Sequence, residues 1–274
     1  MFEDDFFAVH MELSPDVDTY LFRIGLRERP SVTLHGLNEL ILAHQCHVPF
    51  ENIGICDHGY HVSLKINDLY KKIVVENKGG YCFENNASFG SLLNSLGFIV
   101  RPCACRMTRP DGSLTRIIHR ANIVTIGGRE YLCDVSSGGT EAPVAIEIKE
   151  GSVTTCGKEK FYFIRYDENW WEFHCVSPYL DIDEPISEPR DSIAILVCTS
   201  KVLPEDFYAV SDYCCTDPDS PFVLGRRVFI RNKNGFTKLN KNILTIVEGE
   251  DAIVKVIPED DIKVVLEENF GLIY

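Results

Sequence analysis

A glycine pair, Gly127-Gly128, separates two segments that are rich in β-branched and apolar residues, 117–126 and 129–135. Gly-Gly is one of the dipeptides preferred in the tight turns of two-residue β-hairpins. Pairing the two residues that flank the glycines fixes the register of the whole hairpin. The sequence therefore predicts both a hairpin at this point and which of its side chains share a face.

This register brings a histidine and an aspartate together. Asp134 faces Ala121, and His119 lies two residues further along on the same face. Diagonal neighbours of this kind have Cα atoms roughly 7–8 Å apart, within reach of a hydrogen bond between carboxylate and imidazole. A slip of one residue would separate the two side chains. The hairpin thus predicts a His119–Asp134 pair.

A third candidate, Cys82, follows the glycines of the segment Gly-Gly-Tyr-Cys-Phe-Glu at 79–84. Apolar residues between 89 and 96 recur at helical spacing, and Gly97 suits the end of a helix, so we expect a helix that begins near Cys82. The unpaired N–H groups and the positive dipole end of a helix stabilise negative charge. A thiol in this position is therefore favoured as a thiolate.

A cysteine nucleophile, a histidine base and a carboxylate that holds the imidazole are the parts of a catalytic triad for acyl transfer. Taken singly, each residue also has a structural interpretation. Cys82 fits a small buried hydrophobe, His119 a satisfied strand residue and Asp134 a turn or cap group. The helix start and the hairpin geometry together favour the catalytic interpretation.

Several motifs recur in one order along the chain. They are Lys-Gly-Gly-Tyr-Cys-Phe-Glu at 78–84, Val-Pro-Phe-Glu-Asn at 48–52, His-x-x-Asn-x-Val at 119–124, Asp-Val at 134–135 and a helix-like start at 20–25. With these motifs the sequence resembles the arylamine N-acetyltransferases over most of its length. The resemblance implies that Cys82, His119 and Asp134 form the catalytic triad.

The resemblance also implies a fold of the α+β class with a transglutaminase-like Cys-His-Asp core. Its parts would be an N-terminal helical bundle carrying the nucleophile (1–97), a central β-barrel carrying the histidine and aspartate (98–197) and a C-terminal α/β lid (198–274). The sequence pattern agrees, since helical spacing dominates the first part and strand alternation begins at Phe98. Acidic residues and prolines at 178–189 predict a loop or linker.

The implied reaction moves an acetyl group from acetyl-CoA to the amine of an arylamine or arylhydrazine, by a ping-pong route through an acetyl-cysteine. Gly138 and Gly139 are implied as cofactor-binding residues, and Phe50, Ser136 and Ser137 as the substrate pocket. The family usually has Gly-Phe-Gly where this chain has two serines, so an aromatic wall is replaced by hydroxyls. We expect a pocket that is more polar or roomier.

A second departure is Lys78, which stands where the family signature has arginine. If this residue pairs with a carboxylate such as Glu51, lysine loses the bidentate fork of a guanidinium. We expect this change to affect stability more than chemistry.

Three other functions remain open from the sequence. A cysteine hydrolase or transglutaminase-like enzyme would use the same triad with water or a protein amine as acceptor. An amide synthase would close a ring with it. A non-enzymatic scaffold would make the triad dispensable, which the presence of all three residues disfavours.

Composition restricts the partners and the compartment. A formal net charge of −14 argues against nucleic acid or an anionic membrane surface as the main partner. The sequence has no apolar run long enough for a membrane span and an acidic start without a signal-like segment. Eleven cysteines, an odd number, favour free thiols and a cytoplasmic location.

Two short cysteine and histidine clusters superficially resemble metal sites. They are His44-x-Cys46-His47 and Cys103-x-Cys105. Neither is followed by a second ligand pair at the usual spacing, so we expect no metal. The sequence makes no prediction of the oligomeric state.

Overall fold

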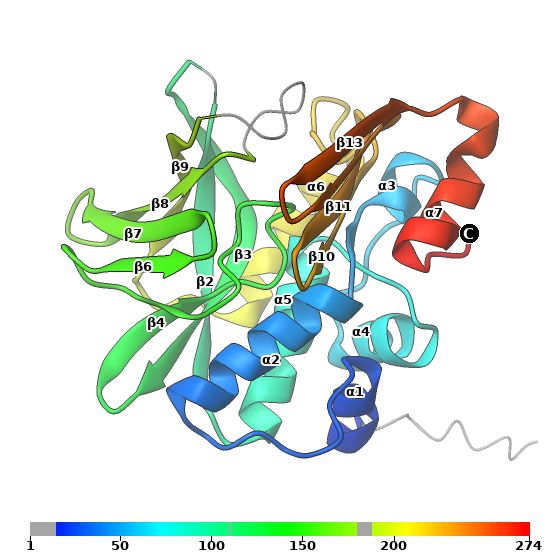
Figure 1. Ribbon diagram of the computed structural model, residues 1–274. Helices are drawn as coiled ribbons and strands as arrows, with labels where there is room; N and C mark the ends of the chain where they lie inside the picture. The colour runs from blue at the N-terminus through cyan, green and yellow to red at the C-terminus, as the bar shows by residue number, and fades with distance from the viewer. Residues whose placement is uncertain (1–14, 110, 180–187) are drawn as a thin grey trace, which may run out of the picture.

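The computed structural model describes residues 15–109, 111–179 and 188–274 (Figure 1). The α-helices among them are α1 (Val17–Arg23), α2 (Leu34–His47), α3 (Ile53–Cys56), α4 (Ile66–Tyr70), α5 (Cys82–Ser95), α6 (Tyr208–Thr216) and α7 (Ile262–Phe270). A π-helical segment, Lys71–Val75, directly follows α4. The loop expected over 178–189 lies for the most part outside the described residues.

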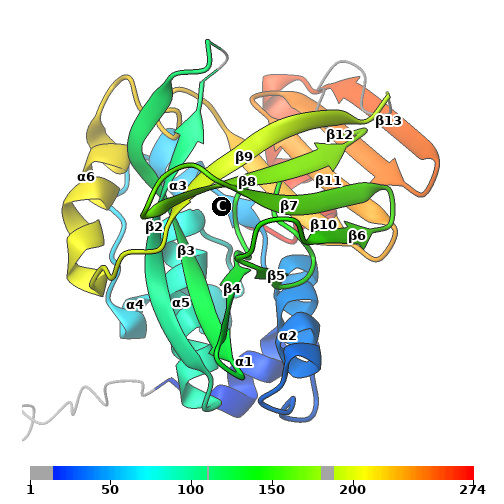
Figure 2. The same cartoon turned by 90° about the vertical axis from the view of Figure 1, so that its left-hand side faces the viewer.

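The strands form two antiparallel sheets. The larger sheet has the order β5-β4-β3-β2-β9-β8-β7-β6 and curls into a nearly closed, barrel-like form (Figure 2). Its strands are β2 (Ile99–Thr108), β3 (Leu114–Ile126), β4 (Arg129–Cys133), β5 (Ile146–Glu147), β6 (Val153–Cys156), β7 (Glu159–Arg165), β8 (Trp170–Ser177) and β9 (Arg190–Cys198). The smaller sheet has the order β1-β10-β11-β12-β13. It consists of β1 (Phe50–Glu51), β10 (Arg227–Asn232), β11 (Gly235–Asn240), β12 (Ile243–Glu248) and β13 (Asp251–Val256).

The predicted start and end of α5 are confirmed. The helix begins at Cys82, and the Glu84 carboxylate accepts a hydrogen bond of 3.1 Å from the N–H of Tyr81, the residue before the helix. Gly97 has a φ of +95°, which allows the N–H of Phe98 to reach the carbonyl of Leu93 across the helix end. The cysteine is therefore fixed on a helix that is capped at both ends.

The predicted hairpin is confirmed as well. Strands β3 and β4 pair with Ile126 opposite Arg129 and Asn122 opposite Cys133, which is the register deduced from the sequence. The two glycines of the turn have φ values of +57° and +76°, as a type I′ turn requires.

The C-terminal region differs from expectation in two places. The apolar run from Val223 predicts a strand over residues 223–230, but strand β10 begins only at Arg227. The N–H groups of Val223 and Leu224 both donate to the carbonyl of Ser220 in a turn. The first part of the chain, expected to be helical, supplies β1, where Phe50 pairs with Phe229 of β10. The division into three domains stays a prediction.

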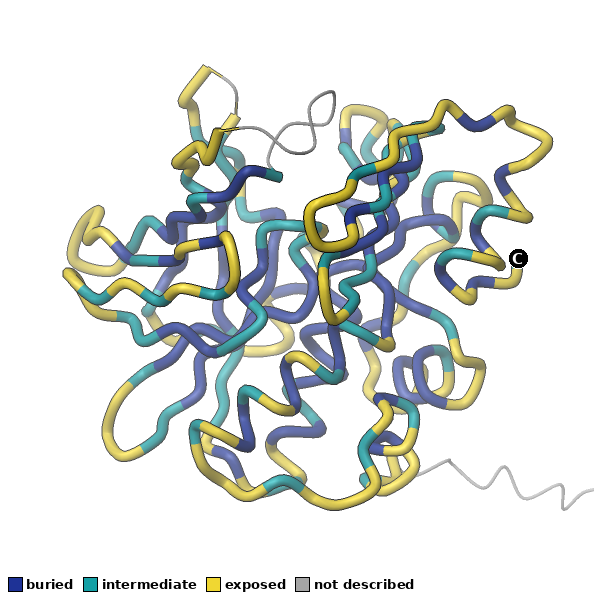
Figure 3. Tube along the Cα trace, viewed as in Figure 1, coloured by how far each residue is buried: buried dark blue, intermediate teal, exposed yellow. Residues whose placement is uncertain are grey.

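Helix α5 lies in the interior of the molecule and contacts β2 and β3 of the larger sheet. Buried residues gather where this helix meets the two sheets (Figure 3). The first residues of α5 belong to a cluster that also contains Phe50 of β1, Phe207 ahead of α6 and Phe229 of β10. The start of α5 thus packs against residues from both sheets and from the region of α6.

Candidate active site

Cys82 is the first residue of α5 and lines a cavity of about 620 Å³. Cys82 is only 1% exposed, and its Sγ lies 3.8 Å from the carbonyl oxygen of Ile118 in β3. Because it is at the first helical position, its backbone N–H has no acceptor within the helix. The Cys82 thiol therefore lies in the cavity wall at the start of a helix, where the first N–H groups have no partner within the helix.

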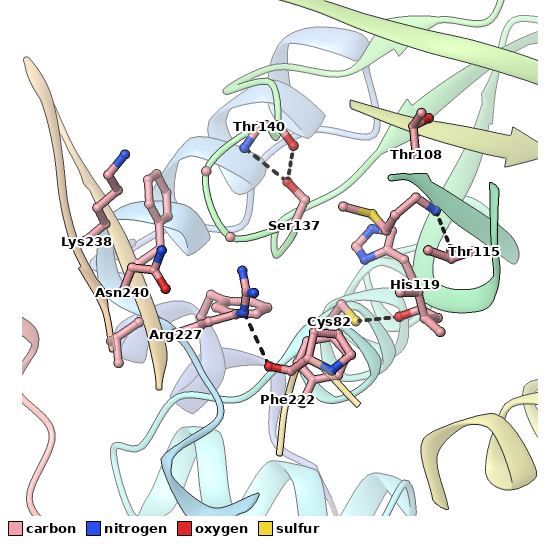
Figure 4. Close-up of a pocket in the computed structure, with 18 of the residues that line it drawn as sticks. Cys82, Thr108, Thr115, His119, Ser137, Thr140, Phe222, Arg227, Lys238 and Asn240 are labelled. Atoms are coloured by element: carbon pink, nitrogen blue, oxygen red, sulfur yellow. Dashed lines mark hydrogen bonds between the residues drawn. The ribbon is translucent and has the colours of Figure 1, made fainter. Parts of the chain in front are cut away.

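His119 also lines this cavity, and its Nε2 lies 2.6 Å from Oδ2 of Asp134. Asp134 is the residue directly after β4, so the diagonal contact expected across the hairpin is present. Both side chains are about 4% exposed. Nε2 is thus occupied by the carboxylate, which leaves Nδ1 as the second ring nitrogen. Figure 4 shows Cys82 and His119 together at the cavity.

The charges of the three residues support one another. Burial alone would lower the pKa of His119, but the Asp134 carboxylate and a Cys82 thiolate outweigh it and hold that pKa well above its usual value. Burial would raise the pKa of Asp134, yet His119 and hydrogen bonds to its oxygens keep it below the ordinary range. The arrangement favours a protonated imidazole paired with the Asp134 carboxylate.

Asn86 orients the carboxylate and was missed by the sequence analysis. Its Nδ2 donates to Oδ1 of Asp134 at 2.9 Å, and its Oδ1 accepts from the N–H of Val135 at 3.1 Å. The backbone N–H of Ser136 donates to the same Asp134 oxygen at 2.9 Å. Asn86 stands four residues after Cys82, so helical spacing places both side chains on the same face of α5.

Phe50, Ser137, Gly138 and Gly139 line the cavity. Ser136 does not. It is fully buried, and its hydroxyl accepts a hydrogen bond of 3.0 Å from Nδ2 of Asn85 behind the wall.

The wall loop is held by a buried carboxylate. Ser137 Oγ donates to Oε2 of Glu141 at 2.5 Å, and the N–H of Gly139 donates to the same oxygen at 2.7 Å. The residue Glu141 is 2% exposed. The hydroxyls of Ser136 and Ser137 thus both have protein partners, Asn85 and Glu141.

Four cations line the cavity against one carboxylate, Asp219, in a chain whose net charge is −14. They are Arg109, Arg116, Arg227 and Lys238. Figure 4 labels Arg227 and Lys238. The cavity also has aromatic walls, formed by Phe50, Tyr179, Tyr213, Phe222, Phe229 and Phe236. A ligand that combines anionic groups with flat rings fits this lining.

Among the described residues, no group of three or more His, Cys, Asp and Glu side chains is arranged to hold a metal ion. In the same part of the chain, no helix is long and apolar enough to cross a membrane.

The histidine–aspartate pair predicts a pH dependence of stability. The raised pKa of His119 contributes stability that is complete below the unfolded value of 6.5 and is lost as pH rises through the folded value. A pKa that is higher by one in the folded state corresponds to about 1.4 kcal/mol. Denaturant unfolding of wild type and His119→Gln at pH 6 and pH 9 should therefore give a larger difference in the free energy of unfolding at pH 6. An equal difference at both pH values would contradict the charged pair.

The sequence matches the model of an N-acetyltransferase family over residues 33–273. An arylamine N-acetyltransferase from Mycolicibacterium smegmatis is 30% identical over 224 residues, which cover 80% of this chain and 77% of that protein. The structure of the Mycobacterium marinum arylamine N-acetyltransferase in complex with CoA superposes with a TM-score of 0.82 at 25% identity, covering 93% of this chain and 92% of that one. An M. smegmatis arylamine N-acetyltransferase structure gives a TM-score of 0.82 at 26% identity over 94% of this chain and 93% of its own. The chain belongs to the arylamine N-acetyltransferase family and is an acetyltransferase.

Proposed function

We propose that this enzyme moves an acetyl group from acetyl-CoA to the amine of an arylamine or arylhydrazine, through an acetyl-cysteine on Cys82. One observation carries the proposal. Cys82 and His119 line the same cavity, and the 2.6 Å contact of His119 with Asp134 leaves the other ring nitrogen for the thiol. This arrangement supports the assignment of the three residues as a cysteine acyl-transfer triad.

In the first half-reaction, the Cys82 thiolate attacks the carbonyl carbon of the thioester. The bond from that carbon to the sulfur of CoA breaks, and the imidazolium of His119 supplies the proton that the departing thiolate takes up. The backbone N–H of Cys82 is the natural donor to the oxyanion of the tetrahedral intermediate. The product is free CoA and an acetylated Cys82.

In the second half-reaction, the amine nitrogen attacks the acetyl carbon and the bond to Cys82 Sγ breaks. His119, now neutral, removes a proton from the attacking amine, which restores the imidazolium and the thiolate. Asp134 fixes the orientation of the ring and stabilises its positive charge in both steps. No proton is gained or lost by the enzyme over the cycle.

The cation-rich lining supports CoA as the carrier of the acetyl group. Arginine and lysine side chains bind phosphate oxygens, and Arg109, Arg116 and Arg227 are exposed at the cavity. Gly138 and Gly139 would let the chain of CoA approach the backbone closely. The N–H of Gly139 is already bonded to Glu141, so its contribution would be space rather than a hydrogen bond.

Initial rates with both substrates varied test the ping-pong scheme. Parallel double-reciprocal lines are expected because CoA leaves before the amine reacts, whereas converging lines would contradict an acetyl-enzyme. The rate of CoA release measured without amine reports transfer of the acetyl group to water. Release as fast as in the presence of amine would favour the hydrolase alternative.

Ser137 is the residue at which acceptor preference is expected to change. Ser137→Phe should lower the KM of a simple arylamine by roughly tenfold, because an aromatic face fills part of the cavity and stacks on the ring. Ser137→Ala is the matched control, since it loses the same hydrogen bond to Glu141 without adding a ring. A KM that changes equally in both variants would show that the wall does not select the acceptor.

We also propose a cytoplasmic location. All eleven cysteines are free thiols, which supports a reducing compartment.

A further inference from the structure

Three charged side chains meet beside the first turn of α5. Lys72 Nζ lies 2.8 Å and 3.0 Å from the two carboxylate oxygens of Glu84, and 3.1 Å from Oε1 of Glu51. The Glu51 side chain is 0% exposed, the Glu84 side chain 3% and the Lys72 side chain 26%. This charge cluster lies outside the catalytic cavity and next to the helix that carries its nucleophile.

Each member of the charge cluster belongs to a different element. Lys72 comes from the π-helical segment Lys71–Val75, a type of turn that is frequent at functional sites. Glu51 follows Phe50, which forms part of the cavity wall, and its Oε2 also accepts the N–H of Ile53 at 2.8 Å. Glu84 is two residues after Cys82 and caps the start of α5. The ammonium of Lys72 therefore ties the cavity wall to the start of the nucleophile helix.

The cluster contains two carboxylates and a single ammonium. Burial and the charge of Glu51 raise the pKa of Glu84, while Lys72 lowers it. Burial opposes the charge of Lys72, but the two carboxylates raise its pKa. Without the ammonium, two buried anions would face each other next to the site of a thiolate, and both would oppose its formation.

Lys78, which stands at the family's arginine position, does not make this contact. Its Nζ is 3.4 Å from Oε2 of Glu76 and 5.6 Å from the ring centre of Tyr274. The pairing with Glu51 that the sequence suggested for Lys78 is thus made by Lys72.

Other titratable groups surround Cys82 and the charge cluster. Around Cys82 they are Tyr81, Cys105 in β2, His119 and Arg120 in β3, Asp134 after β4 and Cys214 in α6. The small cavity beside the charge cluster is also lined by His61, Asp68, Glu76, Lys78 and Tyr274. Of the cations at that cavity, Lys72 is the one within ion-pair distance of both Glu51 and Glu84.

We propose that Lys72 is a positioning residue for the nucleophile: it joins β1 to the first turn of α5 and supplies the positive charge that allows a Cys82 thiolate beside two buried carboxylates. The proposal rests on the assignment of Cys82 as the nucleophile, and its test does not require acetyl-CoA.

The test is the rate at which iodoacetamide alkylates Cys82, followed by peptide mapping as a function of pH. Lys72→Met is expected to slow alkylation at neutral pH by about tenfold, because the midpoint of the profile should lie about one pH unit higher. Lys72→Arg should restore most of the rate because it keeps the charge. Lys71→Met is the matched control. The Lys71 side chain is 62% exposed, and its Nζ lies 3.9 Å from Oε1 of Glu76, outside the charge cluster.

Loss of the contacts of Lys72 with Glu51 and Glu84 also lowers the stability of the fold. Thermal unfolding of each variant is therefore measured in parallel. If Lys72→Met does not fold, Glu84→Gln carries the test, because removal of one carboxylate should move the midpoint to lower pH. A folded Lys72→Met protein with the wild-type profile, or a Glu84→Gln profile that does not move, would overturn the proposal. If the alkylation profile responds as expected but acetyl-CoA does not react, the proposed function fails and the role of Lys72 stands.

Discussion

Cys82→Ser is expected to lower kcat/KM for acetyl-CoA by about 10³-fold or more, with the fold retained. A serine hydroxyl has no populated anion near neutral pH, so the first half-reaction loses its nucleophile even though the space is filled by a similar atom. The buried hydroxyl is similar in size to the thiol and only a little more polar. The temperature of half-unfolding should therefore change by only a few degrees. The rate of CoA release from acetyl-CoA is the measurement.

Cys214→Ser is the control for this experiment. Its thiol is buried in α6 and close enough to Cys82 to influence it, but it does not line the catalytic cavity. We expect it to retain turnover. Wild-type rates in a folded Cys82→Ser protein would exclude a cysteine nucleophile at this position.

Asp134→Asn is expected to lower kcat by about 10³- to 10⁴-fold, because an amide neither stabilises the imidazolium nor holds the required tautomer of His119. The carboxylate also accepts from Asn86 and from the N–H of Ser136, so an amide nitrogen in its place would face donors. Activity is measured over a range of pH, since the loss should not be recovered at any pH at which the enzyme is folded.

Asp191→Asn is a matched control from the same protein. Asp191 Oδ1 lies 2.9 Å from Nδ1 of His174 in the larger sheet, and neither residue lines the cavity. The control removes an aspartate–histidine contact of the same kind and should leave kcat unchanged. An equal loss in both variants would mean that stability, and not orientation of His119, explains the effect.

The contact between His119 and Asp134 could be predicted because a hairpin with a two-residue turn has one register. Once Gly127-Gly128 is taken as the turn, strand geometry alone decides which side chains share a face. The start of α5 could be predicted for a similar reason, since glycines before a helical apolar pattern and Gly97 after it mark the two ends locally.

Such local patterns could not predict contacts between segments that are far apart in the sequence. The pairing of Phe50 with Phe229 joins residues far apart in the chain, and two residues of strand are too few to leave a pattern. Ser136 and Ser137 are adjacent, yet one is turned into the interior toward Asn85 and the other lines the cavity. Which serine lines the cavity depends on the fold of the loop around Glu141.

The choice between Lys72 and Lys78 shows the same limit. The apolar residues Ile66, Leu69, Tyr70 and Ile73 recur at the spacing of a regular α-helix, but the structure changes to a π-helical turn at Lys71. The partner of each lysine is then decided by backbone geometry that composition does not reveal. Asn86 is different, since its position one helical turn after Cys82 was visible in the sequence and its use became clear only with Asp134 in place.

The central claim is an acetyl group carried by Cys82, and the direct measurement is the mass of the protein after incubation with acetyl-CoA in the absence of any amine. We expect the mass of one acetyl group, mapped by peptide analysis to Cys82, and its disappearance when an arylamine is added and the N-acetyl product forms. Formation of that product while Cys82 stays unmodified at every time point would contradict the account.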